Sequence, residues 1–262
     1  MISYRRPLIT AILAASASAA AFADDPPAPP PPQDTWIGRG QVGFLESKGN
    51  SNSESVNGNV DMSRFDGPWK NDIYLAALYG KNNGIVSAER YEARQQTNYN
   101  FAPQMFAFGG LRYEHDLFDG FRYQASAGGG LGYKFLDGKD TALSAQIGAG
   151  FRQIRPETLI TASDGEVTQR IPLETIRSGI GTAEVDFMHK FSATTILTDK
   201  YYMEAGAGNT MLQNNLQLAV KMTTKLALSI GYQVIDNTHP PPGMPPLKKV
   251  GQLTTVNLQF SF

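Results

Sequence analysis

The amino-acid sequence predicts an all-β protein, a transmembrane antiparallel up-and-down β-barrel of about 12 strands, preceded by an N-terminal signal peptide. Three observations lead to this prediction. Extended segments of roughly 10 to 14 residues follow one another after Thr35 without a helical period. Many of these segments alternate apolar and polar residues, and the connections between them alternate in length.

The N-terminus has the pattern of a secretory signal peptide. MISYRRP carries positive charge, LITAILAASASAAA is apolar and small, and Ala21-Phe22-Ala23 supplies an A-x-A site with cleavage expected after Ala23. A membrane anchor is the alternative, but the apolar run is shorter than the roughly 20 residues that a spanning helix needs. We therefore expect an exported protein from which residues 1–23 are removed.

Residues 24–35 read DDPPAPPPPQDT, a composition that favours extended polyproline conformation and cannot enter a sheet interior. They are predicted to form a periplasmic linker, with a ligand for a periplasmic partner as the alternative. The barrel itself is expected over residues 36–262.

Composition excludes several classes of protein. Removing residues 1–23 takes away Arg5 and Arg6 and no acid, which leaves 21 basic residues against 24 acidic ones, so nothing suggests nucleic-acid binding. The chain has no cysteine, and therefore neither disulfides nor thiolate ligands. No second apolar span of about 18 residues indicates a helical membrane protein. We expect no cofactor and no bound metal.

Twelve extended segments account for the predicted barrel. They are placed at 36–47, 54–65, 69–80, 89–100, 104–116, 121–135, 141–153, 173–187, 190–203, 213–222, 225–236 and 249–262.

The connections between these segments alternate in length. The longer series is SKGNSNS, GKNNGIVSAE, the DLFDG turn, the stretch from Ile154 to Pro172, the segment around GAGNTM, and NTHPPPGMPPLK. The shorter series is DGP, AP with its neighbours, LDGKD, a turn at Met188-His189, and MTT. Outer-membrane barrels have short periplasmic turns and longer external loops, so both termini are expected on the periplasmic side.

Several strands show one apolar face and one polar face. In segment 54–65, Val56, Gly58, Val60 and Met62 alternate with Asn57, Asn59, Asp61 and Ser63. Segment 89–100 and the segments beginning at 141, 213 and 225 repeat the pattern, as does the final TTVNLQFSF. The fifth, eighth and ninth segments are less regular, and their faces cannot be assigned.

Alternation alone fits a soluble barrel that binds lipid inside, and the position of the aromatic residues favours the membrane instead. They gather at strand ends in two belts, as membrane interfaces favour. The candidates for the girdle beside the short turns are Trp36, Trp69, Tyr99, Tyr133 and Phe262. An aromatic C-terminus is also what the assembly machinery of outer-membrane barrels is expected to recognise, so Phe262 is assigned that partner.

Longer patterns resemble a known family. Four stretches carry the resemblance: IGRGQVGF followed by SKGNSNS, RYEHDLFDGFRYQASAGGGLGYKF (Arg112 to Phe135), SAQIGAGFRQ (Ser144 to Gln153), and the ending GYQVIDN…KKVGQLTTVNLQFSF. They are similar to the YdiY-like salt-induced outer-membrane proteins, DUF481. The resemblance covers most of residues 36–262, although Val250-Gly251 replaces the family's carboxylate before the last strand. It implies an outer-membrane location and no established chemistry.

The polar faces predict a charged lumen. The lumen-lining candidates are Asp61, Asp72, Arg90, Glu92, Arg94, Arg112, Arg122, Lys134 and Arg152, with Glu114 beside them. Opposed charges could set ion selectivity at a constriction. Alternatively, they could form a salt-bridged filling that makes the barrel rigid, and the sequence leaves both open.

Catalytic patterns are weak, and no catalytic residue is assigned. His115, His189 and His239 fall at strand ends or in loops without a serine partner, and Glu184 and Asp186 share a strand face as solvated lumen charge would. The glycines at 128–130 and 132 are not expected to form a phosphate-binding loop, because no helix follows them; small residues on a barrel wall relieve crowding.

The predicted function is therefore a monomeric outer-membrane barrel that acts as a small-solute or ion channel, or in envelope integrity under salt or osmotic stress. A plugged structural barrel, or one that binds lipopolysaccharide or protein, is the alternative; a lipid-modifying enzyme is a third possibility. The proline-rich loop from Asn237 to Lys249 could contact lipopolysaccharide phosphates or serve as a protease-resistant lid. Outer-membrane lipids and lipopolysaccharide are the expected surroundings.

Overall fold

The computed structural model describes residues 34–47, 52–117, 120–163, 165–240, 243–244 and 246–262. The predicted signal peptide, residues 1–23, and most of the predicted linker, residues 24–35, lie outside the described residues. Within them, the regular elements are all β-strands. No helix in this part of the chain is long and apolar enough to cross a membrane.

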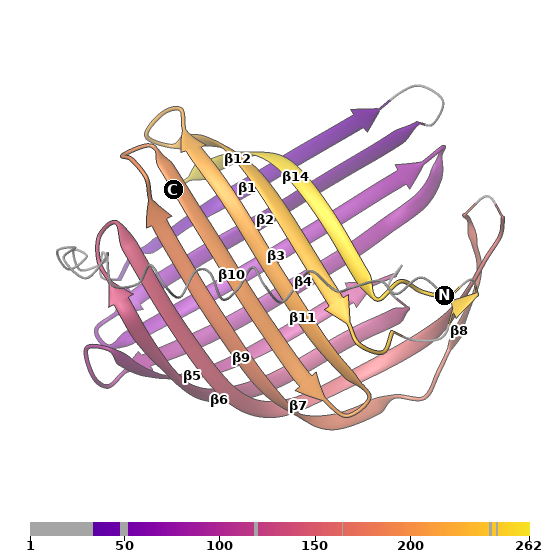
Figure 1. Ribbon diagram of the computed structural model, residues 1–262, viewed down its shortest axis with the longest axis horizontal. Helices are drawn as coiled ribbons and strands as arrows, with labels where there is room; N and C mark the ends of the chain where they lie inside the picture. Colours follow the sequence, from indigo (N-terminus) through magenta and orange to yellow (C-terminus); the bar gives the residue numbers. More distant parts are fainter. Residues whose placement is uncertain (1–33, 48–51, 118–119, 164, 241–242, 245) are drawn as a thin grey trace, which may run out of the picture.

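Twelve strands of the described chain form a closed antiparallel barrel (Figure 1). They are β1 (Trp36–Ser47), β2 (Ser53–Asp66), β3 (Trp69–Asn82), β4 (Ile85–Asn100), β5 (Met105–Asp116), β6 (Phe121–Asp137), β7 (Thr141–Thr161), β9 (Ile176–Lys190), β10 (Thr195–Gly206), β11 (Asn209–Lys221), β12 (Leu226–Asn237) and β14 (Val250–Ser261). Each pairs with the next, and β1 closes the ring against β14, where Gln41 faces Gln259. Closure leaves no unpaired edge in the ring.

The barrel has two different ends, which we call the terminus end and the loop end. Trp36 and Phe262 lie at the terminus end, where the backbone of Phe262 exchanges two hydrogen bonds with Gly38, at 2.9 and 3.0 Å. The connections between β2 and β3, β4 and β5, β6 and β7, β9 and β10, and β11 and β12 lie at this end as well. The other connections lie at the loop end.

The prediction of a twelve-stranded barrel is confirmed, with local corrections. The turn predicted at Met188-His189 is wrong, because both residues belong to β9 and the chain turns over residues 191–194. There, Phe191 and Ser192 donate backbone hydrogen bonds to Thr195. Val185, Phe187 and Phe191 continue the outward apolar pattern of β9 through residue 188, so the alternation itself does not support a turn at this position.

Two connections predicted to be long are two-residue turns. β3 and β4 join through Asn83 and Gly84, with φ of 51° and 83°. β10 and β11 join around Gly208, whose φ is 85°. Left-handed backbone at these turn residues matches the twist of the flanking strands of a hairpin. The strands therefore continue up to the turns, through polar residues that the sequence analysis assigned to loops.

The stretch predicted as a long connection after Ile154 is mostly strand. β7 continues to Thr161 and turns back as β8 (Val167–Pro172), which pairs with β7 from Glu157 to Thr161. The short β13 (Gly243–Met244) pairs with β7 in parallel on its other side. Together they form a three-stranded extension that rises from one side of the loop end (Figure 1).

The polarity of the barrel is that of a membrane protein. Phe151, Ile147 and Phe44 are 77%, 70% and 68% exposed on the outer face, whereas Arg152 and Glu204 are 2% and 1% exposed inside. A water-soluble barrel would bury the first group and expose the second. The apolar outer face requires hydrocarbon as its solvent, so the strands span a membrane.

Inward phenylalanines explain why the fifth strand had no regular pattern. Phe106 and Phe108 of β5 point into the barrel and lie over glycines of β6 and β7. A Cβ at Gly132 would lie 2.0 Å from Phe106 Cζ, and one at Gly148 would lie 2.9 Å from Phe108 Cζ. Gly132 of β6 and Gly148 of β7 therefore make room for aromatic rings, whereas a Cβ at Gly128, Gly129 or Gly130 would meet backbone atoms of the adjacent strands. The expectation that small residues relieve crowding on this wall agrees with this packing.

Candidate functional site

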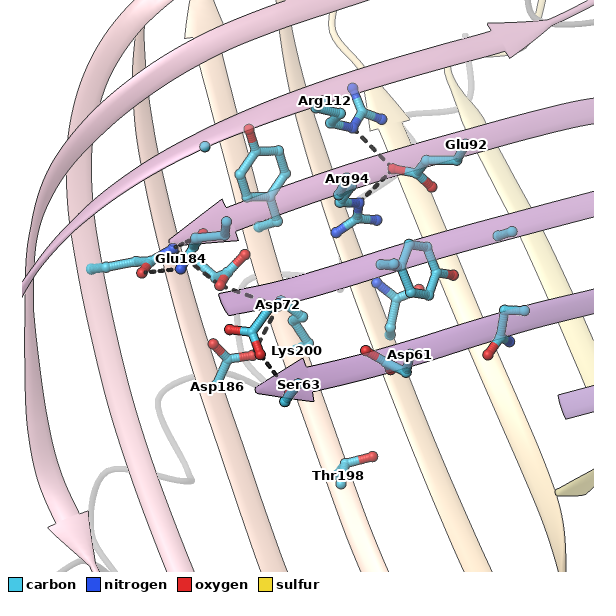
Figure 2. Close-up of a pocket in the computed structure, with 18 of the residues that line it drawn as sticks. Asp61, Ser63, Asp72, Glu92, Arg94, Arg112, Glu184, Asp186, Thr198 and Lys200 are labelled. Carbon is cyan, nitrogen blue, oxygen red and sulfur yellow. Dashed lines mark hydrogen bonds and ion pairs between the residues drawn. The ribbon is translucent and has the colours of Figure 1, made fainter. Parts of the chain in front are cut away.

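The barrel lumen holds a polar chamber of about 1150 Å³ (Figure 2). Its walls are the inward faces of the strands, because side chains along a strand alternate between the two faces. It begins beside the terminus-end turns, where Phe65 and Lys70 line it, and reaches inward to Arg90 and Arg112. Seven basic and six acidic side chains line it: Arg39, Lys70, Arg90, Arg94, Arg112, Lys134, Lys200, Asp61, Asp72, Glu92, Asp137, Glu184 and Asp186.

An arginine–glutamate network of β4 and β5 lines the inner end of the chamber. Glu92 Oε1 accepts from Arg94 Nε at 2.6 Å and from Arg112 Nε at 3.0 Å, as Figure 2 shows. Arg90 joins Glu92 at 3.2 Å and Glu114 at 2.6 Å. Every side chain of this network is 21% exposed or less, so each charge is compensated within the wall rather than by water.

Bonds across the lumen tie this network to the opposite wall. Arg90 Nη1 donates to Gln233 Oε1 of β12 at 3.0 Å, although β4 and β12 are not neighbours in the ring. Arg112 Nη2 contacts the sulfur of Met211 of β11 at 3.8 Å. Two strands that are far apart in the ring are therefore held at a short distance through their side chains.

A second ion pair lies beyond the chamber toward the loop end. Arg152 of β7 contacts Glu204 of β10 at 3.2 Å, and both side chains are 1% exposed. Ser126 donates to the same carboxylate at 3.1 Å, and Gln213 nearby on β11 is 1% exposed. Water does not reach these side chains, so this part of the lumen is filled.

We call the residues Arg90, Glu92, Arg112, Glu114, Arg152, Glu204 and Gln233 the central layer.

On the other side of the barrel, the Asn57 side chain of β2 donates a hydrogen bond to that of Asn257 of β14 at 2.9 Å, across β1. Gly43 permits this contact, because a Cβ there would lie 2.1 Å from Asn257 Oδ1. Glycine is thus required where a polar bridge passes directly over a strand.

The chamber wall nearer the terminus end carries smaller ion pairs. Lys200 of β10 contacts Glu184 at 3.2 Å and Asp186 at 3.4 Å. On the facing strands, Asp72 accepts from Ser63 and pairs with Lys70 at 2.9 Å. Glu184 and Asp186 do share a strand face, and both carboxylates contact one lysine.

Most of the lumen-lining candidates come together in this structure. Asp61, Asp72, Arg90, Glu92, Arg94, Arg112 and Lys134 line the chamber, and Arg152 lies in the central layer. Asp61 pairs with Arg39 at 3.0 Å, and Lys134 with Asp137 at 3.3 Å.

Arg122 does not line the chamber. It lies where the β6–β7 register shifts between Phe121 and Tyr123, and its side chain is exposed. A bulge of this kind inserts one residue outside the alternation and redirects its side chain. The two-residue period that places Arg112 and Arg152 inside therefore fails at Arg122.

The sequence identified Glu92 and Glu114 but not the lumen residues that β10 and β12 supply. Lys200, Tyr202 and Glu204 lie on β10, one of the strands whose faces could not be assigned. They occur at alternate positions, as does Thr198, but the polar Asp199 on the opposite face obscures this alternation in the sequence. Gln233 lies among the inward residues of β12, yet a pairing with Arg90 requires knowledge of the ring.

Two of the histidines contact threonine hydroxyls. His189 Nδ1 lies 2.9 Å from the Thr141 hydroxyl, and His239 Nδ1 lies 3.1 Å from that of Thr238. No group of three or more His, Cys, Asp or Glu side chains among the described residues could hold a metal ion.

The girdle candidates lie on the outer face at the terminus end. Trp36, Trp69, Tyr99, Tyr133 and Phe262 are all exposed. The rings of Trp69 and Tyr99 are 4.7 Å apart, and the Tyr133 hydroxyl donates to Gln104 at 2.6 Å. Their arrangement, with ring bodies outward and polar atoms near the turns, is typical of a membrane interface.

Comparison with known proteins gives a family but no characterised relative. No curated protein matches the chain. Among solved structures, the NanC porin aligns with a TM-score of 0.48 at 10% identity, over 86% of this chain and 98% of the porin. The KdgM porin aligns at 0.43 and 10% identity over 87% and 99%. The translocator domain of the autotransporter NalP from Neisseria meningitidis aligns at 0.41 and 10% identity over 96% and 95%. The family model for DUF481, proteins of unknown function, matches residues 40–262, and the chain therefore belongs to the DUF481 family.

Proposed function

We propose that this protein is an outer-membrane barrel of the Gram-negative type that keeps its own lumen closed and contributes to envelope integrity. Its termini and the other connections of the terminus end face the periplasm, and the loop end with its β7–β8 extension faces outward. The apolar outer face and the aromatic girdle support the membrane assignment. The family resemblance adds an expected role under salt or osmotic stress.

The observation that carries the closed state is the central layer. Arg90 reaches across to Gln233 at 3.0 Å, and the Arg152–Glu204 pair is 1% exposed on both sides. In an open aqueous pore, water would solvate these charges. Here the charged side chains are buried, and burying a charge is costly unless a partner compensates it. The polar chamber is then a vestibule that opens toward the periplasm and ends at this layer.

Planar-bilayer recording tests the proposal. The folded wild-type protein should give a flat current trace, since ions cannot pass the central layer. The triple substitution Arg90→Ala, Arg112→Ala and Arg152→Ala removes the cross-lumen bonds and the Arg152–Glu204 pair, and it should produce discrete conductance steps. Both proteins must show the heat-modifiable gel mobility of a folded barrel. Steady channel activity of the wild type would contradict the closed barrel.

A second candidate function is the passage of small polar solutes or ions. The chamber of about 1150 Å³ favours it, because balanced charges along a wide polar cavity suit a permeation path. In this case the wild type conducts, and Arg94→Ala or Arg152→Ala changes the anion-to-cation selectivity. The same recordings therefore distinguish the two functions.

We also propose that the protein is not an enzyme. A chromosomal deletion should leave the lipid A and phospholipid profiles unchanged while sensitivity to salt increases. An altered lipid A profile that the wild-type gene restores would favour a lipid-modifying barrel instead.

A further inference from the structure

The outer wall of the barrel carries a groove, of about 670 Å³, on the face turned away from the lumen. It crosses the strands from β3 to β9, and two adjacent rows of hydrogen-bonded neighbours form it. The upper row is Leu75, Ala93, Tyr113, Ala125, Gln153 and Arg177; the lower row is Ile73, Gln95, Leu111, Ala127 and Phe151. We call this the outer groove.

The groove arises from the alternation of large and small side chains across the strands. Ala93, Ala125 and Ala127 form its floor, whereas Leu111 and Phe151 project beside them and are 60% and 77% exposed. The result is a narrow apolar furrow in a wall that faces hydrocarbon. Its width suits a flexible apolar chain rather than another strand, because the wall has no free backbone groups.

The groove runs from the middle of the membrane to its outer surface. Strands tilted by about 40° gain roughly 2.5 Å of depth per residue. Leu75 lies six residues from Trp69, the terminus-end residue of β3, about 15 Å in depth. Arg177 lies thirteen residues from Lys190, the terminus-end residue of β9, about 32 Å in depth. The groove therefore spans most of the leaflet that faces the loop end, and Arg177 lies at that leaflet's interface.

Polar side chains with unused donors collect at the upper end of the groove. Arg177 Nε donates to Gln153 Oε1 at 2.9 Å, and Gln153 Nε2 donates to the Tyr123 hydroxyl at 2.7 Å. Tyr123 stacks on Tyr113, with ring centroids 6.3 Å apart. This chain of contacts holds the Arg177 guanidinium in place and leaves its two terminal nitrogens without a partner among the described residues.

A second arginine lies beside the first. Arg155 is two residues beyond Gln153 on β7, so it shares the outward face and is a diagonal neighbour of Arg177. Its Nε is buried and has no hydrogen-bond partner in the described part of the chain. Neither guanidinium forms an ion pair with a described acid, unlike the arginines of the central layer. Exposed Arg122, next to Tyr123, adds a third positive charge at this end.

We propose that the outer groove is a lipid site, in which one acyl chain of a phosphorylated outer-leaflet glycolipid of the lipid A type lies along the furrow while Arg155 and Arg177 hold its phosphate. Guanidinium groups bind phosphate oxygens in pairs of charge-assisted hydrogen bonds, and two of them on one face match a doubly charged phosphate. The apolar furrow directly below provides the place for the chain. The choice of glycolipid rests on the orientation given under the proposed function, which directs the loop end to the outer leaflet.

Native mass spectrometry of the detergent-solubilised full chain tests this site, with bisphosphorylated hexa-acyl lipid A as the added probe. The wild type should retain one such molecule. Arg155→Gln with Arg177→Gln should weaken retention at least 10-fold, and Ala127→Trp, which fills the furrow, should do the same. Matched controls are Lys81→Gln, a basic residue at the loop end of β3, and Gly40→Trp on the outward face of β1, where a Cβ meets open space. Both should change retention less than 2-fold.

Two further probes identify the chemistry. Lipid A lacking phosphates should bind at least 10-fold more weakly than the bisphosphorylated form, and equal binding overturns the role of the arginines. Phosphatidylglycerol should also bind more weakly; equal binding overturns the glycolipid assignment. Retention that is equal in all variants overturns the site.

The lipid-retention experiment and the conductance experiment test the lipid site and the closed lumen independently. Channel activity would contradict the closed lumen without affecting lipid retention. Conversely, loss of the lipid site leaves the flat current trace in place. Surface accessibility of an epitope inserted between Asn83 and Gly84, at the loop end, tests the orientation by itself.

Discussion

Arg152 of β7 and Glu204 of β10 form an ion pair, with Nη1 and Oε1 3.2 Å apart, inside a barrel that otherwise exposes its apolar surface. Arg152 also donates from Nη2 to the carbonyl oxygen of Asn209 at 2.9 Å. Both charges are thus compensated by the protein alone. Such a pair contributes little net stability when intact, but removal of one member leaves a buried charge without a partner.

Arg152→Ala should therefore destabilise the folded barrel by about 3–5 kcal/mol, because Glu204 would remain buried and unpaired. Urea unfolding in lipid vesicles, followed by tryptophan fluorescence, measures this loss. Arg39→Ala is the control: Arg39 pairs with Asp61, but these side chains are 39% and 37% exposed. Arg39→Ala should lower the free energy of unfolding by less than about 1 kcal/mol, since exposed ion pairs contribute little to stability. Equal costs for the two variants would contradict a water-excluded central layer.

Gly132→Ala should destabilise the barrel by about 1–3 kcal/mol, since overpacking forces neighbours from their positions. The new Cβ would lie 2.0 Å from Phe106 Cζ. Combining it with Phe106→Leu, which removes the ring, should recover at least half of the loss in the same unfolding assay. Additive losses in the double variant would show that the two side chains do not compete for this space.

Ile147→Arg should cost about 2–4 kcal/mol, because a charge would enter the hydrocarbon near the middle of the membrane. Ile147 is 70% exposed and lies six residues into β7 from Thr141. Phe44→Arg is a matched change close to the loop end of β1 and should cost about 0–1 kcal/mol. Vesicle unfolding gives both values. The reverse order, or wild-type protein that stays dissolved without detergent, would contradict the assignment of the outer face to lipid.

Phe262→Ala should reduce the amount of barrel in the outer membrane of cells several-fold, while folding of the purified chain into detergent changes little. The backbone hydrogen bonds between Phe262 and Gly38 survive this substitution, so the barrel can still close. Quantitative blotting of membrane fractions measures assembly, and heat-modifiable mobility measures folding. Phe260→Ala, on the same face of β14, controls for loss of an outward ring. Equal amounts of Phe262→Ala and wild type would remove the proposed recognition by assembly machinery.

The barrel could be predicted because the alternation that defines each strand is contained within that strand's own sequence. A strand in a membrane barrel must alternate, so Val56 against Asn57, or Leu258 against Asn257, already shows which face meets lipid. β5 resisted assignment because Phe106 and Phe108 face inward, and they can do so only where Gly132 and Gly148 lie beside them. Such compensation between strands leaves no pattern within either one.

The site was predictable as a set of residues but not as a network. Alternation along β4 gave Arg90, Glu92 and Arg94, all of which line the chamber. The contact of Arg90 with Gln233 depends on the closure of the ring, which brings residues 143 positions apart together. Arg122 differs because one inserted residue at the β6 bulge changes the period.

The extension built from β7, β8 and β13 gives the outward surface one stiff side. Arg170 of β8 pairs with Glu157 at 2.8 Å and also donates to the carbonyl oxygen of Leu117, which follows β5. Three separate stretches of chain are thereby fastened to one long strand. With the loop end outward, as proposed, antibodies or phages would meet a rigid ridge there. Engineered peptide epitopes are then better carried at Asn83-Gly84, where the chain forms only a two-residue turn.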